Sequence, residues 1–296
     1  MLFKRDPVPF LTGAKGTFYA HGVTGIDYME YNGSHTAYFC GVSDEGESIG
    51  RLVFEKIPKD ISKIDSIPII SPGSKGEFDD KLVFDPAAVS VDGKVYLYYS
   101  GVGFGEDRIG LAISNDGYQF EKHKGPILVG RAPEIVYKAG VFHLFYVLDN
   151  EMGGYNIHHA QSTDGIHFDP LPEPAIRAEE GFWDGLTVVT SRIVFYNGYY
   201  YCFYAGGDKT KDEPTGFGVC RSTDLIKWEK SREVLLALGE KGTFDDSAMW
   251  IPDVAIIDGV AHMWYEGAYN DENGKCVSCL GYACADVGEI ERLFRK

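Results

Sequence analysis

Runs of apolar and aromatic residues alternate with short polar turns along the whole chain, and one pattern recurs five times. Each copy has two runs rich in Val, Ile, Tyr and Phe, joined by a turn that contains glycine. The copies read GIDYMEYNGSHTAYFCG from Gly25, FDPAAVSVDGKVYLYYSG from Phe84, RAPEIVYKAGVFHLFYV from Arg131, SRIVFYNGYYYCFYAGG from Ser191 and IPDVAIIDGVAHMWYEG from Ile251. Asn-Gly and Asp-Gly turns supply the positive φ that a tight hairpin needs, so each copy predicts a β-hairpin.

A third run follows every hairpin, and a short fourth apolar segment follows four of them. The third runs include IGRLVFEK, RIGLAISNDG, NIHHAQSTDG, FGVCRSTDL and CLGYACAD, and the fourth segments are IPIIS, GPILVG, EPAIRA and EVLLAL. Four strands per repeat, at a spacing of about 50–60 residues, are typical of a β-propeller blade. The last repeat lacks a fourth strand, whereas DPVPFL near the start of the chain resembles a fourth strand without a repeat of its own.

The pattern therefore predicts an all-β fold, namely a single five-bladed β-propeller domain with four-stranded blades over residues 1–296. We expect the N-terminal strand to close the ring on the last blade, because a closed ring leaves no unpaired strand edge. No stretch with helical periodicity is longer than a turn or two.

Composition narrows the choice of partner. The 296 residues carry a net charge of −16. This charge argues against nucleic acid and against an anionic membrane surface, because both attract clustered Lys and Arg. The start, MLFKRDPVPFLTG, lacks the features of a secretory signal, and no apolar run is long enough to span a bilayer. We expect a soluble, cytoplasmic protein whose six cysteines form neither a disulfide scaffold nor a zinc site.

Candidate chemistry lies where the first strand of each repeat begins. In a propeller these strands line the central channel, so the residues at their starts converge at one mouth. The residues at these positions are Asp27, Asp85, Glu134, Arg192 and Asp253. A cluster of carboxyls can keep one acid protonated and another ionised, which is the arrangement that glycoside cleavage uses. The alternative is that these side chains satisfy backbone groups or bind channel water and cations.

The same acidic channel is compatible with a bound Ca²⁺. Hard cations need several oxygen ligands at defined geometry, and no loop signature in the chain specifies such a site. The sequence therefore requires no cofactor, and the identity of any metal stays open.

Cationic and aromatic residues near the predicted mouth are candidates for substrate contact. Arg131 and Arg192 are suited to bind sugar hydroxyls or a carboxylate, or else to lower the pKa of a neighbouring Asp. Trp250 and Trp183 offer ring faces that can stack on a sugar. His21, in the first-repeat loop GTFYAHG, is either a ligand or a solvated loop residue.

Three loops before the first strands share an aromatic-Asp motif: GEFDD from Gly76, GFWDG from Gly181 and GTFDD from Gly242. We expect Asp79, Asp184 and Asp245 to fix the loop turns through hydrogen bonds to nearby backbone. Contact with sugar is the alternative role.

With these repeats and acids, the chain resembles the five-bladed propeller glycosidases, the superfamily of glycoside hydrolase families 43, 32, 62, 68, 117 and 130. In family 43 a base or nucleophile Asp, an Asp in a DP motif that tunes pKa and a general-acid Glu act together. FDPAAVSVDG matches the DP motif, so the resemblance implies that Asp85 is the tuning residue. RAPEIVYKAG follows in the next blade and makes Glu134 the general-acid candidate. The base stays open between Asp27 and Asp253. The family 130 motif GxEDPR and the family 32 signature NDPNG are absent.

The resemblance implies a family 43-like glycoside hydrolase that acts from the end of a small oligosaccharide or glycoside. Glu134 would protonate the leaving oxygen, Asp27 or Asp253 would activate water, and Asp85 would set geometry and pKa. Two other functions remain compatible with this fold. One is glycosyl transfer to phosphate or to another sugar, and the other is sugar binding without catalysis.

Overall fold

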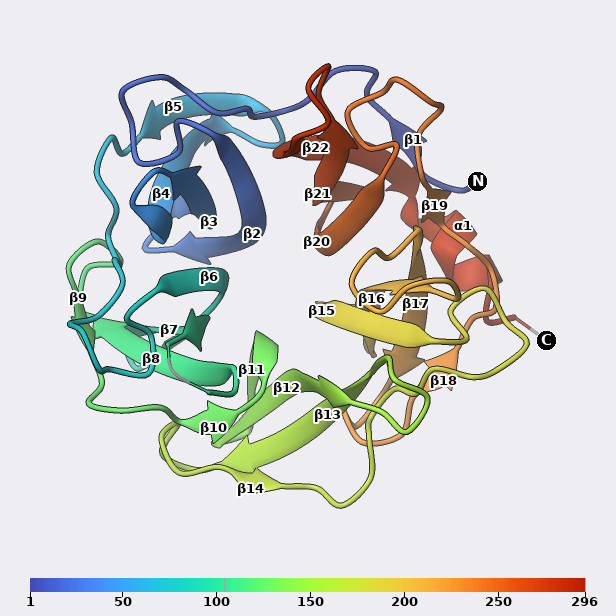
Figure 1. Cartoon of the computed structure of the whole chain (residues 1–296). Helices are drawn as coiled ribbons and strands as arrows, with labels where there is room; N and C mark the ends of the chain where they lie inside the picture. Colours follow the sequence, from blue (N-terminus) through green and yellow to red (C-terminus); the bar gives the residue numbers. More distant parts are fainter. Residues whose placement is uncertain (104, 296) are drawn as a thin grey trace. The chain divides into compact units, whose positions relative to one another are not determined.

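The computed structural model describes residues 1–103 and 105–295, which form five antiparallel sheets (Figure 1). In each sheet the first strand of one sequence repeat lies at one end of the strand order, followed by the second and third strands. This is the fold class of a five-bladed β-propeller, so the predicted all-β architecture is confirmed.

The strands follow the repeats closely. The first sheet contains β2 (Gly22–Tyr31), β3 (Ser34–Ser43), β4 (Gly46–Lys56) and β5 (Asp60–Ile64). The second contains β6 (Leu82–Val91), β7 (Lys94–Val102), β8 (Arg108–Ser114), β9 (Phe120–Lys122) and β10 (Leu128–Val129). The third contains β11 (Arg131–Lys138), β12 (Val141–Asp149), β13 (Tyr155–Ser162) and β14 (Asp169–Pro170).

The last two sheets are built in the same way. The fourth contains β15 (Thr187–Tyr196), β16 (Tyr199–Gly207), β17 (Gly216–Ser222), β18 (Glu229–Lys230) and β19 (Leu236–Ala237). The fifth contains β20 (Ala248–Ile257), β21 (Val260–Asn270), β22 (Cys276–Asp286) and β1 (Lys4–Arg5). The short helix α1 (Val287–Arg292) follows β22.

The chain divides into two compact units. Unit 1 comprises Met1–Leu11, Val147–His158 and Pro172–Lys296, and unit 2 comprises Thr12–Tyr146 and His159–Leu171. The first two sheets belong to unit 2, the last two belong to unit 1, and the residues of the third sheet are divided between them.

The predicted hairpin turns are confirmed in all five repeats. Each turn between the first and second strands has two successive residues with positive φ, of which the second is glycine. The pairs are Asn32-Gly33, Asp92-Gly93, Ala139-Gly140, Asn197-Gly198 and Asp258-Gly259. Two left-handed residues in succession define a type I′ turn, whose twist matches that of the flanking strands.

In the second and fourth sheets the fourth position is occupied by two short strands instead of one. In the second sheet β9 pairs with one half of β8 and β10 pairs with the other half. In the fourth sheet β18 and β19 likewise pair with different parts of β17. The apolar segments predicted as fourth strands therefore supply only the second of two short pairings, because the chain loops away from the sheet between them.

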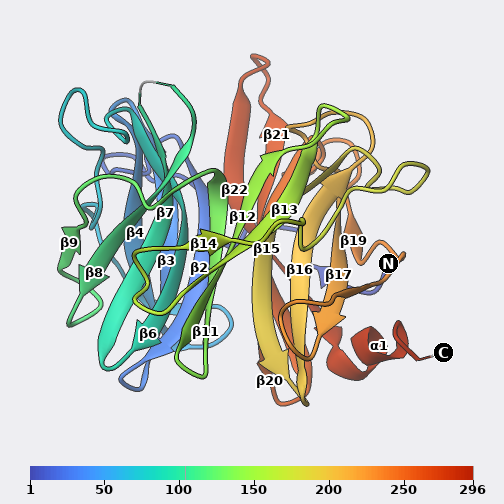
Figure 2. The ribbon, with the colours of Figure 1, turned by 90° about the horizontal axis from the view of Figure 1, so that it is seen from below.

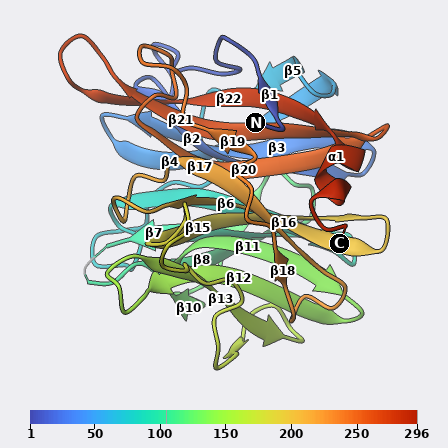
Figure 3. The same ribbon diagram turned by 90° about the vertical axis from the view of Figure 1, so that its right-hand side faces the viewer.

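The N-terminus supplies the outer position of the last sheet, as predicted. Strand β1 pairs antiparallel with β22, and Leu11 forms an isolated bridge with Leu280 (Figure 3). The DPVPFL segment lies along β22 as well, since the backbone N–H groups of Asp6 and Phe10 donate to the carbonyls of Tyr282 and Leu280. The regular pairing is made by Lys4 and Arg5 just before that segment.

Each unit has a core of aromatic and β-branched side chains from its own strands. In unit 2 a buried cluster joins the first two sheets through Tyr38, Ile49, Val83, Leu97 and Tyr99. In unit 1 the strands β15, β16 and β17 lie side by side (Figure 2), and Phe217 of β17 packs edge-on against Tyr265 of β21 at 5.6 Å between ring centroids. Strands β15, β16 and β17 are buried in nearly continuous runs, which is the pattern of strands that are covered on both faces of the sheet.

The cysteines are free thiols, and Cys40, Cys202 and Cys220 are buried in the sheets. In the CVSC segment Cys279 is buried but Cys276 is exposed. Within the described residues, no helix has the length and apolar character needed to cross a membrane.

Candidate active site

The first strand of each sheet carries a local irregularity close to the predicted site residues. In β2, β6, β15 and β20 the pairing with the second strand shifts register, which marks a β-bulge. Each first strand has one residue with a left-handed φ of 35° to 52° at this point: Gly25, Asp85, Ala132, Thr190 and Ile251. Bulges redirect side chains and are frequent beside active sites.

The bulge changes the alignment of the five predicted residues. Four of them lie two positions after the left-handed residue: Asp27, Glu134, Arg192 and Asp253. Asp85 is itself the left-handed residue, and Ala87 stands where the other strands carry a polar side chain. The equivalence of Asp85 with the other four is therefore wrong by two positions. An Asp in this backbone conformation is strained by about 1–3 kcal/mol, a feature that clusters at functional sites.

Asp85 is held by a chain of hydrogen bonds within unit 2. Its Oδ2 atom accepts a hydrogen bond from the hydroxyl of Ser100 at 3.0 Å. The same hydroxyl oxygen accepts the backbone N–H of Ala132 at 2.8 Å. Asp85 and Ser100 are both buried. This chain connects β6 and β7 with β11, the strand that also carries Arg131 and Glu134.

Asp27 performs a similar connecting role from β2. Its Oδ2 atom accepts the backbone N–H of Ala88 on β6 at 2.8 Å. Strand β6 neighbours both β2 and β11 in unit 2. Unit 2 thus places Asp27, Asp85 and Glu134 on three neighbouring first strands, each with its side chain at least nine-tenths buried.

A fourth carboxyl, that of Glu47, belongs to the same part of unit 2 and was not identified from the sequence. Burial raises the pKa of Glu47 above its ordinary value, and the charge of Asp85 raises it further. The hydrogen bond from Cys40 and the charge of Arg131 act in the opposite direction. In the sequence Glu47 stands in the acidic stretch SDEGES and does not differ from a solvated loop residue such as Glu45.

Arg131 supplies positive charge to this cluster. Its guanidinium lies 5.9 Å from the centroid of the Phe84 ring and 3.8 Å from the carboxylate of Asp107. A guanidinium in this position can bind hydroxyls or stabilise ionised carboxylates.

Arg192 and Asp253 belong to unit 1. Arg192 is 2% exposed, and its guanidinium donates a hydrogen bond to the backbone carbonyl of Ser191 at 2.9 Å. Asp253 is also buried, and Trp250 lies opposite the buried Glu266 in the pairing of β20 with β21. Glu266 is another acid that sequence reasoning missed, because it lies within a second strand that reads as ordinary β-core sequence.

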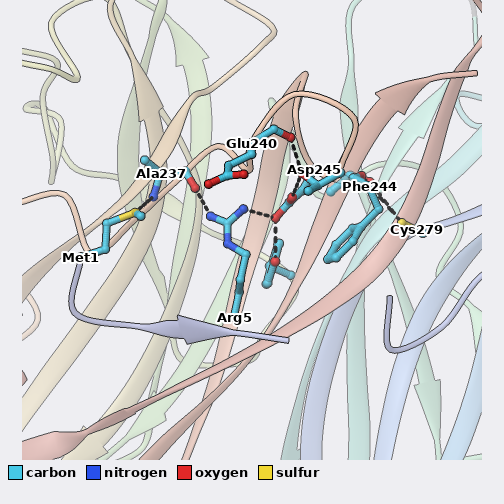
Figure 4. A network of polar contacts seen from close by, with 10 residues as sticks. Met1, Arg5, Ala237, Glu240, Phe244, Asp245 and Cys279 are labelled. Atoms are coloured by element: carbon cyan, nitrogen blue, oxygen red, sulfur yellow. Dashed lines mark hydrogen bonds and ion pairs between the residues drawn. The ribbon is translucent and has the colours of Figure 1, made fainter. Parts of the chain in front are cut away.

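The three aromatic-Asp motifs have a structural role that differs from the predicted one. Each Asp accepts a hydrogen bond from the hydroxyl of a tyrosine that lies twenty positions later in the chain. Each also forms an ion pair with a Lys or an Arg. The sets are Asp79 with Tyr99 and Lys122, Asp184 with Tyr204 and Lys230, and Asp245 with Tyr265 and Arg5. Figure 4 shows the contact between Arg5 and Asp245. These buried carboxylates stabilise the sheets through side chains of the second and outer strands, whereas the expected partners were backbone groups of the loop.

The Trp183 side chain is partly packed in the sheet and partly lines a surface recess. A Cβ atom at Gly218 would lie 2.9 Å from its ring, so part of the indole fills space that glycine leaves open. The indole also lines a recess of about 610 Å³ in unit 1, together with Met152, Phe182, Glu180 and other residues. Phe182 is 42% exposed. Exposed aromatic rings beside carboxylates are suited to bind a sugar.

His21 lies in the loop before β2, and its Nε2 atom is 2.7 Å from the carboxylate of Asp44. Among the described residues, no group of three or more His, Cys, Asp and Glu side chains is arranged to hold a metal ion.

The fold and its buried carboxyls define a five-bladed β-propeller with a polar site on its first strands. β-1,2-Mannobiose phosphorylase from Listeria innocua, in complex with β-1,2-mannobiose, is similar over 99% of both chains, with a TM-score of 0.78 and 14% identity. A structure described under GH130 glycoside hydrolases that target β-1,2-mannosidic linkages in Candida mannan is similar over 95% of this chain and 93% of that one, with a TM-score of 0.74 and 15% identity. At these identities the likeness shows a shared fold.

Sequence relatives match only part of the chain. The 1,2-β-oligomannan phosphorylase of Thermoanaerobacter sp. (strain X514) is 35% identical over 111 residues, which are 34% of this chain and 36% of that protein. An uncharacterized protein of Mycobacterium tuberculosis is 27% identical over 155 residues, and the match spans about half (52%) of its length. No family model matches the chain.

Proposed function

We propose that the protein is a glycoside hydrolase that acts on an oligosaccharide of the β-mannoside type. The observation that carries this proposal is the set of buried carboxyls on neighbouring first strands of unit 2, Asp27, Asp85 and Glu134. Buried carboxyls are costly unless they are paired or serve a function, and acid-base cleavage of a glycosidic bond needs two of them with different pKa values. The mannoside substrate is taken from the named relatives and structural neighbours.

In the proposed reaction Glu134 protonates the leaving glycosidic oxygen, and either Asp27 or Asp253 activates the attacking water. Asp85 orients the substrate, since the Ser100 hydroxyl holds its carboxylate on a strained backbone. Arg131 contributes positive charge to the same part of unit 2, where it acts on Glu47.

Phosphorolysis is the second candidate, because two of the named proteins are phosphorylases. A phosphate dianion needs a cationic pocket. Asp27, Asp85 and Glu134 are buried on neighbouring strands of unit 2, and Arg131 is the cation that acts on the nearby Glu47. We infer from this excess of carboxyls that water is favoured over phosphate as the acceptor.

The proposal is tested by product release from β-1,2-manno-oligosaccharides, with other glycosides as a comparison panel, in the presence and absence of phosphate. We expect free sugar without phosphate, and a loss of about 10²–10⁴ in rate for Glu134→Gln. Glu289→Gln on the exposed face of α1 is the matched control and should retain full activity. Asp27→Asn and Asp253→Asn, measured side by side, identify the base by the larger loss.

Two results would contradict the hydrolase assignment. Formation of a sugar 1-phosphate only when phosphate is present would assign the protein to phosphorolysis. No release from any glycoside by the wild-type protein would contradict an enzymatic role, and binding of the same sugars would then indicate a lectin-like propeller.

A further inference from the structure

Glu47 occupies a position from which it can influence the carboxyls of the first strands. It lies at the start of β4 and pairs across the sheet with Val42, which in turn pairs with Gly22 at the start of β2. Its Oε2 atom accepts a hydrogen bond from the thiol of Cys40 at 3.4 Å. The Cys40 sulfur is fully buried and also lies 3.7 Å from the backbone carbonyl of Val83, two residues before Asp85 on β6.

Charged and titratable groups face Glu47 from three neighbouring strands of unit 2. Cys40 approaches it from β3, Asp85 acts on it from β6 and Arg131 acts on it from β11. Arg131 is itself shared with Asp107, whose carboxylate is 3.8 Å from the guanidinium. Arg131 therefore acts on two carboxyls, those of Glu47 and Asp107.

Asp85 and Glu47 differ in the hydrogen-bond donors that they face. The Ser100 hydroxyl accepts the N–H of Ala132, so its own proton is directed to Asp85, an arrangement that suits an ionised carboxylate. Glu47 has the weaker thiol as donor, and burial raises the pKa of the Cys40 thiol well above its ordinary value, so that thiol stays protonated. A second ionised carboxyl beside Asp85 would add like-charge repulsion in a buried place.

We propose that Glu47 is a positioning residue of this site, which holds a proton beside ionised Asp85 and thereby sets the pH range in which Asp85 and Glu134 act. The proposal deepens the proposed function and rests on it for the readout of activity. The protonation of Glu47 itself can be measured without any substrate.

The first experiment is a pH titration of the whole protein labelled with ¹³C at the glutamate side-chain carboxyls, followed by NMR. Glu47→Gln assigns the Glu47 signal by its loss, and Glu45→Gln, in the same loop but exposed, gives the matched control signal. We expect the Glu47 signal to titrate above the ordinary glutamate value of about 4.3. A midpoint at or below that value would overturn the proposal.

A second variant keeps this test independent of the folding of Glu47→Gln. Cys40→Ala removes the thiol that donates to Glu47 and so removes a contribution that lowers the Glu47 pKa. We expect the midpoint of the Glu47 signal to rise in this variant. A midpoint that falls would contradict the arrangement of donors described here.

The second experiment measures the pH dependence of glycoside cleavage. A protonated Glu47 is neutral like glutamine, so Glu47→Gln should match the wild type at low pH and depart from it several-fold above the Glu47 midpoint. A constant ratio of the two rates at every pH would indicate a merely structural role and would overturn the proposal. If the wild type cleaves no glycoside, the proposed function fails, while the NMR titration still decides whether Glu47 holds a proton.

Discussion

A buried histidine pair makes unit 2 sensitive to acid. The Nδ1 atom of His143 on β12 lies 3.0 Å from Nε2 of His159 on β13, and the His159 ring stacks on Phe145 with 4.4 Å between ring centroids. Burial, with a smaller contribution from His143, lowers the pKa of His159 from 6.5 to about 3. Burial and the charge of Lys138 lower the pKa of His143 as well.

The sign of the effect follows from the two protonation states. In the unfolded chain His159 binds a proton as pH falls through 6.5, whereas in the folded protein it stays neutral until about pH 3. Stability from this group is therefore complete above pH 6.5 and decreases by about 1.4 kcal/mol per pH unit below it. Between pH 7 and pH 5, His159 alone lowers the free energy of unfolding by about 2 kcal/mol.

The assay is denaturant unfolding at pH 7 and pH 5 of the wild type, His159→Gln and the control His167→Gln. Glutamine offers a polar nitrogen near the position of Nε2 but does not titrate, and His167 is an exposed histidine. We expect His159→Gln to be less stable than the wild type at pH 7 by about 1–3 kcal/mol, because the ring contact with Phe145 is lost. From pH 7 to pH 5 the free energy of unfolding of His159→Gln should fall by about 2 kcal/mol less than that of the wild type or of His167→Gln. An equal loss in all three would refute the reasoning.

Three further predictions concern stability and activity. Asp245→Asn should lower the free energy of unfolding by about 2–4 kcal/mol in chemical denaturation, because it leaves a buried ion pair incomplete, while Asp258→Asn in an exposed turn should change it little. Gly218→Ala should lower the melting temperature, because its Cβ would lie 2.5 Å from the Tyr204 side chain and 2.9 Å from the Trp183 ring; an unchanged melting temperature would contradict this packing. Ser100→Ala should lower kcat for glycoside cleavage without unfolding the protein, as checked by circular dichroism, and an unchanged kcat would separate that hydroxyl from catalysis.

The architecture of the chain could be predicted because its determinants are local. Each hairpin depends on a few consecutive residues, such as Asn32-Gly33, whose positive φ values form the expected turn. The repeat spacing then predicts five sheets, and the surplus strand at the N-terminus predicts the pairing of β1 with β22. These features survive because turn chemistry and the alternation of apolar residues act over short distances along the chain.

The identity of the buried carboxyls was also partly accessible from the sequence, since acids inside apolar strand patterns are unusual. Asp27, Glu134 and Asp253 are buried on first strands, each two positions after a left-handed residue. Their catalytic roles remain predictions for the activity measurements above.

Only the tertiary structure decided the surroundings of these acids. Asp85 is itself the left-handed residue of its strand, whereas the other predicted residues lie two positions later. A DP motif in the sequence does not reveal this backbone conformation. The contact of Glu47 with Cys40 and the link of Asp245 to Arg5 join residues that are 7 and 240 positions apart. Local sequence therefore determined the strands and turns of this protein. Burial, charge and hydrogen bonding at the site arise from strands packed against one another, because they depend on which distant side chains share a space from which water is excluded.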